Sequence, residues 1–282
     1  MSRCNRALIP HPSSLTETRD KLGGMPELPE VETYTRYFAR HALHQRIARV
    51  DVRDERILGE VRKETFARKL KGKQFAAVRR HGKHLFADAG VTWLHLHFGM
   101  TGDLSYSRDT EPPRFARVVF VFDNGARLAF EDMRLFGLVD LVSDPDAFIR
   151  DRGLGPDPLQ LTPKRFAALL DKRRGAVKSL LMSQELIAGL GNLYVDEILY
   201  QTAVHPRRAV DQLTAAEGKA MFTAMRRILR EAIARHAREG ELPAHYLFHH
   251  REVGERCPKC GGTIQRTVVF GRTTYFCAKH QR

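Results

Sequence analysis

Residues 25–32, Met-Pro-Glu-Leu-Pro-Glu-Val-Glu, place a proline and several carboxylates where a helix begins. Removal of Met25 would leave Pro26 with a free secondary amine, whose pKa is about 8. Part of such an amine is unprotonated at neutral pH, so it can attack an electrophilic sugar carbon and form an iminium ion. Glu27 can move the protons that this chemistry requires. The structural alternative is that Pro29 occupies the first turn of a helix whose positive end favours acidic neighbours.

Three of the four cysteines lie near the C-terminal end of the sequence. Cys257-Pro-Lys-Cys260 is followed, after sixteen residues, by Cys277-Ala-Lys-His280. Two such pairs can close a tetrahedral zinc site, and three thiolates with one imidazole are a permitted ligand set. Four protein ligands leave no position for a reactive water, so we expect one structural zinc ion per chain. The alternative is three buried cysteines and a histidine in a tail.

A glycine-rich turn, Gly189-Leu-Gly191-Asn192, separates two stretches with helical periodicity. Backbone N–H groups at the start of the second stretch suit a phosphate. Arg272, between the two cysteine pairs, can hold a phosphate through two parallel hydrogen bonds. The plainer interpretations are a helix–helix turn with Asn192 as its N-cap, and a solvated arginine.

The composition favours an anionic polymer as the partner. The 282 residues include 47 Lys and Arg against 33 Asp and Glu, which gives a net charge of +14. No stretch approaches the roughly 20 apolar residues of a membrane span, so we expect no membrane partner. The clustered, odd-numbered cysteines fit a reducing cytoplasm better than a disulfide framework. We therefore expect a cytoplasmic protein whose partner is a nucleic acid.

The periodicity changes along the chain and indicates an α+β protein of several domains. Residues 1–24 are polar and end in Gly-Gly, so we expect a disordered extension or a misassigned start. A helix is expected over 29–42, and antiparallel strands, which favour a β-sandwich, follow it. Asn124-Gly125 predicts a hairpin turn. The strands are expected at 46–53, 75–88, 92–98, 115–122 and 127–130.

Helical signals dominate after a Pro- and Gly-rich linker at 143–161. Thr162-Pro163 is typical of an N-cap followed by proline in the first turn. Thr214 and Glu217 form a capping-box pattern. The core face of the helix that they start is predicted to comprise Met221, Met225, Ile228, Leu229 and Ile233.

Taken together, these motifs make the chain resemble the formamidopyrimidine-DNA glycosylase/endonuclease VIII family of base-excision repair enzymes. The resemblance covers residues 25–282. It rests on MPELPEVE, HGKHL (81–85), HFGMTG (97–102), MRLFG (133–137), LGPDPL (154–159), QELIAGLGNLYVDEIL (184–199) and the terminal cysteine pattern. It implies an N-terminal helix with an antiparallel β-sandwich (25–142), a helix–two-turn–helix domain (162–240) and a zinc-finger hairpin (241–282).

The resemblance also implies roles for single residues. Pro26 resembles the nucleophile that attacks C1′ of the damaged nucleotide, and Glu27 resembles its acid/base partner. Lys83, otherwise a solvated charge on a strand, resembles a catalytic lysine that holds a phosphate near the lesion. Asn192 matches the phosphate-binding asparagine of the family. Arg272 matches the arginine of the finger, and we count Arg272 with the catalytic residues.

A second implied group replaces the extruded base. Met100, Arg134 and Phe136 match three residues that fill the gap in the duplex: the apolar side chains restore stacking, and the guanidinium pairs with the orphaned base. For Met100 and Phe136 the alternative is core packing. The resemblance thus implies a bifunctional DNA glycosylase and AP lyase acting on double-stranded DNA with damaged bases or abasic sites. It also implies a monomer that associates with the nucleoid through DNA.

Three departures from the family pattern affect this interpretation. The preceding residues place Pro26 in an amide bond, and a chain that keeps them would be a non-catalytic DNA-binding protein on the same fold. His280 stands where the family usually has a cysteine. Residues 239–256 are much shorter than the loop that caps 8-oxoguanine in some members. Their aromatic stretch, 246–250, either lines the pocket edge or packs the finger against the helices. An RNA-binding zinc module is a remote rival that leaves MPELPE unexplained.

Overall fold

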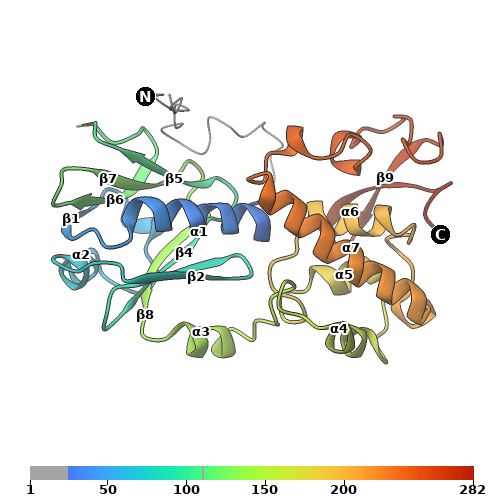
Figure 1. Ribbon diagram of the computed structural model, residues 1–282, viewed down its shortest axis with the longest axis horizontal. Helices are drawn as coiled ribbons and strands as arrows, with labels where there is room; N and C mark the ends of the chain where they lie inside the picture. The colour runs from blue at the N-terminus through green and yellow to red at the C-terminus, as the bar shows by residue number, and fades with distance from the viewer. Residues whose placement is uncertain (1–24, 110) are drawn as a thin grey trace, which may run out of the picture.

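The computed structural model describes residues 25–109 and 111–282. Figure 1 shows a β domain at one end of the molecule and a helical domain at the other, with a small hairpin module against the helices. Helix α1 (Leu28–Ala42) runs from the helical domain along the β domain. The expectation for residues 1–24 lies outside the described residues.

The β domain is the predicted antiparallel sandwich. One sheet has the order β1-β6-β7-β5 and the other β2-β3-β4-β8, and neighbouring strands are antiparallel. The strands are β1 Ile47–Val52, β2 Ala77–His81, β3 His84–Asp88, β4 Trp93–His97, β5 Gly102–Ser107, β6 Ala116–Phe122, β7 Arg127–Asp132 and β8 Leu138–Val142.

The prediction of one strand over 75–88 was wrong, because the segment folds into the hairpin β2–β3. Gly82 has a φ of +54°, which L side chains rarely adopt, and it turns the chain immediately before Lys83. Lys83 therefore sits on a tight turn. The hairpin predicted at Asn124-Gly125 is present between β6 and β7, with Gly125 at a φ of +80°.

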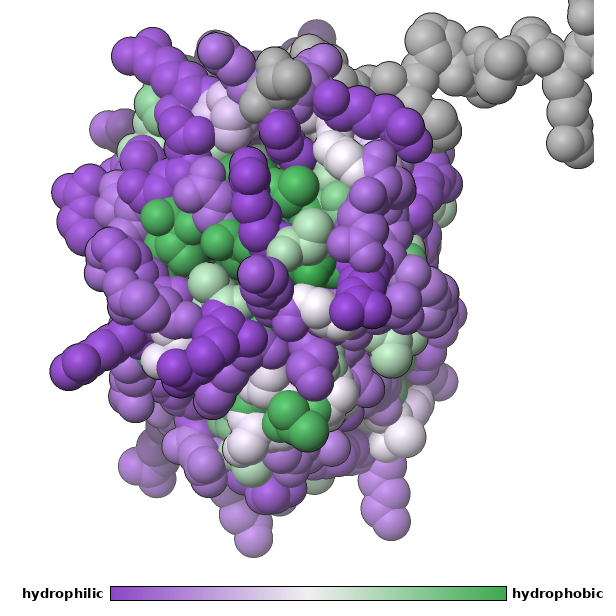
Figure 2. Space-filling model, turned by 90° about the vertical axis from the view of Figure 1, so that its left-hand side faces the viewer, coloured by the Kyte–Doolittle hydropathy of each residue, from purple (hydrophilic) through white to green (hydrophobic). Residues whose placement is uncertain are grey.

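Apolar side chains from both sheets and from α1 form the core of the β domain. Phe38 of α1 packs edge-on against Phe75, which in turn meets Phe120 of β6. Helix α2 (Lys63–Leu70), which the sequence analysis did not predict, adds Phe66 to this core. The outer end of the domain is mostly hydrophilic around a central apolar area (Figure 2).

The helical domain comprises α4 (Pro163–Leu170), α5 (Val177–Met182), α6 (Asn192–Gln201) and α7 (Ala215–Ala234), and α3 (Pro145–Asp151) interrupts the expected linker. The Thr162 hydroxyl accepts from the Arg165 N–H, as an N-cap should. The capping box at Thr214 is also confirmed. The predicted core face of α7 is buried throughout.

The finger is the hairpin β9 (Ile264–Val269) and β10 (Arg272–Cys277), preceded by the short turns η4 (Glu239–Glu241) and η5 (Leu247–His249). Tyr246 and Phe248 are buried in the core of the helical domain, and Leu247 packs with the finger. The aromatic stretch therefore joins the finger to the helices. Among the described residues, no helix is long and apolar enough to cross a membrane.

Candidate active site

A cavity of about 740 Å³ lies where the β domain, the helical domain and the finger meet. Five of the residues that the sequence singled out line it: Glu27, Lys83, Met100, Asn192 and Arg272. These residues come from widely separated parts of the chain. The size is typical of small-ligand sites, and the wall combines one carboxylate with several cationic and amide groups.

The Glu27 carboxylate occupies the N-terminus of α6. It accepts hydrogen bonds from the backbone N–H groups of Gly191 at 2.6 Å and of Leu193 at 2.8 Å. The interpretation of this turn as a phosphate cradle was therefore wrong, because a carboxylate from another part of the chain already fills it. The predicted attraction of the α6 N-terminus for an anion is nevertheless present, because helix N-termini favour negative charge and the anion here is the Glu27 carboxylate. Gly191 is required here, because an added Cβ would lie 2.4 Å from the Glu27 carboxyl carbon.

Burial raises the pKa of Glu27 to about 7, although Lys83 and the N–H groups of Leu193 and Gly191 lower it, and Glu30 raises it further. A carboxyl group with this pKa exists in both protonation states near neutrality. It can therefore donate and accept a proton under ordinary conditions. Among titratable groups, one that lines a cavity and has so perturbed a pKa is a candidate for catalysis.

Lys83 faces Glu27 from the β2–β3 turn. The residue is only 8% exposed, and burial lowers its pKa, an effect that Glu27 and Glu30 oppose and Arg272 reinforces. Among the described residues, no group accepts a hydrogen bond from its Nζ. A desolvated cation without a bonded acceptor is suited to an anionic ligand in the cavity.

Pro26 is buried beside Glu27, and its nitrogen is bonded to Met25, which lines the cavity. The segment is fixed at two points. The Glu27 N–H donates to the Glu30 carboxylate at 2.9 Å, and the Leu28 N–H donates to the Gly189 carbonyl oxygen at 3.0 Å. Pro26 is thus fixed by the first turn of α1 between Met25 and Glu27, which line the cavity, although Pro26 itself does not.

Asn192 is the first residue of α6, and its side chain does not cap the helix. Its Nδ2 donates to the Thr273 carbonyl of the finger at 3.0 Å, and its Oδ1 accepts from Lys178 Nζ at 2.7 Å. Lys178 is fully buried and also bonds Asp196 at 2.6 Å and the Thr274 hydroxyl at 2.6 Å. This network, which sequence reasoning missed, holds the finger hairpin at the cavity.

Arg134 and Phe136 lie on the β7–β8 loop next to the turn that carries Met100. The Arg134 N–H donates to the Thr101 hydroxyl at 3.0 Å, and its guanidinium lies 4.7 Å from the Phe136 ring. Phe136 is 56% exposed, so the core-packing alternative does not apply to it. The loop carries a guanidinium and an exposed ring beside the cavity.

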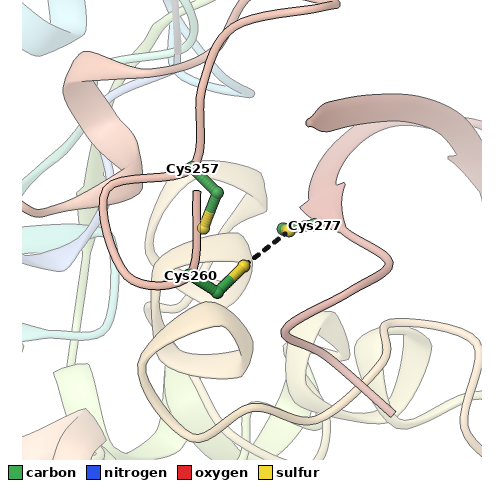
Figure 3. Close-up of side chains that lie close together, drawn as sticks. All are labelled: Cys257, Cys260 and Cys277. Carbon is green, nitrogen blue, oxygen red and sulfur yellow. Dashed lines mark hydrogen bonds between the residues drawn. The ribbon is translucent and has the colours of Figure 1, made fainter. Parts of the chain in front are cut away.

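The Sγ atoms of Cys257, Cys260 and Cys277 lie within 4.8 Å of one another (Figure 3). Zn–S bonds of about 2.3 Å can bridge such a group, so the three thiols fit one zinc ion. Within the described chain, His280 does not join this group. Its Nε2 lies 2.9 Å from the Tyr200 carbonyl oxygen, while the Tyr200 hydroxyl contacts Cys257 Sγ at 3.2 Å.

Two histidines of the cavity wall, His84 and His97, were also missed. Both lie within motifs quoted above, at the edges of strands, and only the pairing of β3 with β4 brings them together. Arg251 and Tyr275 complete this wall from the finger side.

Three family descriptions match consecutive parts of the chain: the formamidopyrimidine-DNA glycosylase N-terminal domain at 25–139, the H2TH domain of the same enzymes at 154–241, and the zinc finger found in FPG and IleRS at 254–279. The formamidopyrimidine-DNA glycosylase of Symbiobacterium thermophilum is 36% identical, over 91% of this chain and 89% of its own. That of Streptococcus pyogenes serotype M6 is 37% identical, over 92% and 99%.

Among solved structures, the Lactococcus lactis enzyme in complex with abasic-site DNA is similar, with a TM-score of 0.82 and 28% identity over 91% of this chain and 99% of that one. The fold and the site thus define a DNA glycosylase of base-excision repair with AP lyase activity. The chain belongs to the formamidopyrimidine-DNA glycosylase family.

Proposed function

We propose that Pro26 is the nucleophile of this enzyme and Glu27 its acid/base group. The Pro26 nitrogen attacks C1′, the glycosidic bond breaks, and the base leaves with a proton supplied through Glu27. The C1′–O4′ bond then opens, with O4′ taking up the proton that the Pro26 nitrogen has lost, and the nitrogen lone pair forms the C=N bond of an iminium ion. The iminium ion acidifies C2′, so loss of its proton expels the 3′ phosphate, and a second elimination expels the 5′ phosphate. The observation that carries the proposal is the buried Glu27 carboxyl, with a pKa of about 7, directly beside Pro26.

This chemistry needs a free amine, so we propose that the active form begins at Pro26. An amide nitrogen is not a nucleophile, and in the full chain Met25 acylates Pro26. The match to the N-terminal family domain begins at residue 25, which supports the proposal. A chain that keeps the preceding residues would bind damaged DNA without cleaving it.

The remaining site residues are proposed to hold the DNA. Lys83, Asn192 and Arg272 line the cavity, and we propose that they contact phosphates of the DNA. Met100, Arg134 and Phe136 are proposed to enter the gap left by the extruded base. An exposed aromatic ring beside a guanidinium supplies the stacking surface and the donor that an orphaned base needs.

We propose that Cys257, Cys260, Cys277 and His280 hold one structural zinc ion. The three thiols are already grouped, and His280 follows Cys277 through a tight turn in which its N–H donates to the Cys277 carbonyl. The fourth ligand would be His280, which must then give up its contact with the Tyr200 carbonyl. The metal would fix the two ends of the hairpin that carries Arg272.

The lesion preference is proposed from the lining of the cavity. Of residues 239–256, only Arg251 lines it, while Tyr246, Leu247 and Phe248 are buried elsewhere. Little chain is thus positioned over the face of a flipped base, and discrimination depends on hydrogen bonds to that base. We infer broad activity on ring-opened purines and oxidised pyrimidines, the fastest cleavage at abasic sites, and weak excision of 8-oxoguanine.

Single-turnover excision on matched duplexes that differ only in the lesion tests this proposal. The Pro26-starting protein is expected to act fastest on abasic sites and slowest on 8-oxoguanine opposite cytosine. If 8-oxoguanine were the damaged base removed fastest, the short segment at 239–256 would not determine specificity. Absence of cleavage at any lesion by this form would overturn the catalytic proposal itself.

A further inference from the structure

One face of the sheet β2-β3-β4-β8 carries a group of imidazoles for which the proposed chemistry has no role. His84 pairs in register with His81 on one side and with His97 on the other. Its ring centre lies 5.0 Å from that of His97 and 5.2 Å from that of His95. His84 and His97 line the same cavity as Lys83.

A hydrogen bond joins His84 to a histidine in the core. His84 Nδ1 lies 2.9 Å from His95 Nε2. His95 is fully buried, and its Nδ1 has no partner among the described residues. Within the described chain, His95 Nδ1 is unpaired in either tautomer. If His84 donated in this bond, the unpaired atom of a neutral His95 would be an N–H, and buried N–H groups without a partner are rarer than buried acceptors without one. The favoured arrangement has His95 donating from Nε2 to His84 Nδ1.

This arrangement determines what His84 presents to the cavity. With Nδ1 accepting, the proton of the neutral ring lies on Nε2. Among the described residues, no group accepts a hydrogen bond from His84 Nε2, and this atom is not among the buried unpaired ones. The free end of the ring is therefore an N–H donor beside Lys83, which itself has no bonded acceptor.

The surroundings keep His84 uncharged. Burial lowers its pKa well below the ordinary value, and His95 and His97 from β4, His81 from β2 and Lys83 from the turn lower it further. Burial likewise lowers the pKa of His95 to about 3. Phe148 of α3 packs edge-on against the His84 ring. At neutral pH the ring is thus a neutral donor that adds no repulsion to Lys83.

We propose that His84 is a DNA-contacting residue whose Nε2–H donates to a phosphate oxygen of the strand held by Lys83 and Arg272, and that His95 is the positioning residue that fixes its tautomer. The proposal rests on the proposed function, because it needs the DNA backbone to lie in the cavity. Phosphate is the ligand class because the neighbouring groups without bonded acceptors are cations, and hydrogen bonds to charged groups are stronger than neutral ones.

Binding of a duplex that contains a tetrahydrofuran abasic analogue tests the contact without requiring catalysis. His84→Leu is expected to raise Kd about tenfold at pH 7.5, as loss of a hydrogen bond to a charged group implies. The slope of log Kd against log salt should stay unchanged, because no cation is lost, whereas Lys83→Met should reduce it by about one. His44→Asn, which removes an exposed imidazole beyond the end of α1, should leave Kd unchanged.

The positioning role has its own readout. His95→Leu should raise Kd about threefold and mix the His84 tautomers in ¹⁵N imidazole spectra, and His95→Gln, which keeps a donor, should restore both. In the wild-type protein the His84 Nε2–H resonance should shift when the analogue is added, a measurement that needs no variant to fold.

Three results would overturn the proposal. They are His84→Leu binding within twofold of wild type, a reduced salt slope in that variant, and an unshifted resonance in wild-type protein that binds the analogue. Wild-type protein that neither binds nor cleaves abasic DNA would instead overturn the proposed function, so the two failures can be told apart.

Discussion

Replacing Lys83 by methionine should move the pH dependence of catalysis upward. The pKa of Glu27 is about 7 because burial raises it and Lys83 is the largest factor opposing that rise. An opposite charge close to a carboxyl group typically lowers its pKa by about 1 to 3. Removing the cation should therefore raise the pKa of Glu27 to about 8 or higher. A rise of one pKa unit corresponds to about 1.4 kcal/mol in the relative free energy of the two protonation states.

The assay is single-turnover cleavage of abasic DNA by the Pro26-starting protein from pH 5.5 to 9.5, with enzyme saturating so that weaker binding does not enter. In the plot of cleavage rate against pH, the limb due to the titration of Glu27 is identified as the one that disappears in Glu27→Gln. Arg272→Met is the matched control, because Arg272 lines the same cavity and is not among the groups that shift the Glu27 pKa. If the apparent pKa of the Glu27 limb stayed near 7 or fell in Lys83→Met, the reasoning would be refuted.

The other predictions concern the metal and acid stability. Metal analysis should find one zinc per chain. In the full chain of 282 residues, which is expected to bind DNA, Cys260→Ser should lose zinc and weaken binding, whereas Cys4→Ser should change neither. A zinc-free wild type or normal binding by Cys260→Ser would contradict this. Burial lowers the pKa of His95 to about 3 and of His97 to about 4, and that of His84 well below its usual value, so the unfolded chain binds more protons between pH 4 and 6.5. The free energy of unfolding should be insensitive to these rings above about pH 6.5 and fall below it by about 1.4 kcal/mol per pH unit for each ring. Urea unfolding should show a shallower fall for His95→Leu, and an identical slope would contradict the assignment.

Much of the site could be predicted because its residues lie in local patterns. The cysteine spacing predicts a hairpin-bridged metal site, and the two adjacent residues Pro26 and Glu27 supply the proposed nucleophile and the proposed proton carrier. The capping signals at Thr162 and Thr214 are likewise complete within one turn of helix. Such features depend on short stretches of chain, so the sequence alone contains them.

The remaining features depend on contacts between distant segments. The α6 N-terminus was expected to hold a phosphate, and only the fold shows that Glu27, 164 residues before Gly191, takes that place. Lys178 meets Asp196 and Thr274 only after the finger docks on the helices. His84 and His95 become partners through the register of β3 with β4. No local pattern in the sequence specifies these pairings.

Borohydride trapping on abasic DNA tests the central claim, catalysis by a free Pro26 amine, most directly. Borohydride adds hydride to the iminium carbon and converts the transient adduct into a stable amine. The protein that starts at Pro26 should form a covalent complex of the combined mass, with the modified residue mapping to Pro26, and the protein that retains residues 1–25 should form none. Equal trapping by both, with the extension shown intact by mass, would contradict the account, as would an adduct on Lys83.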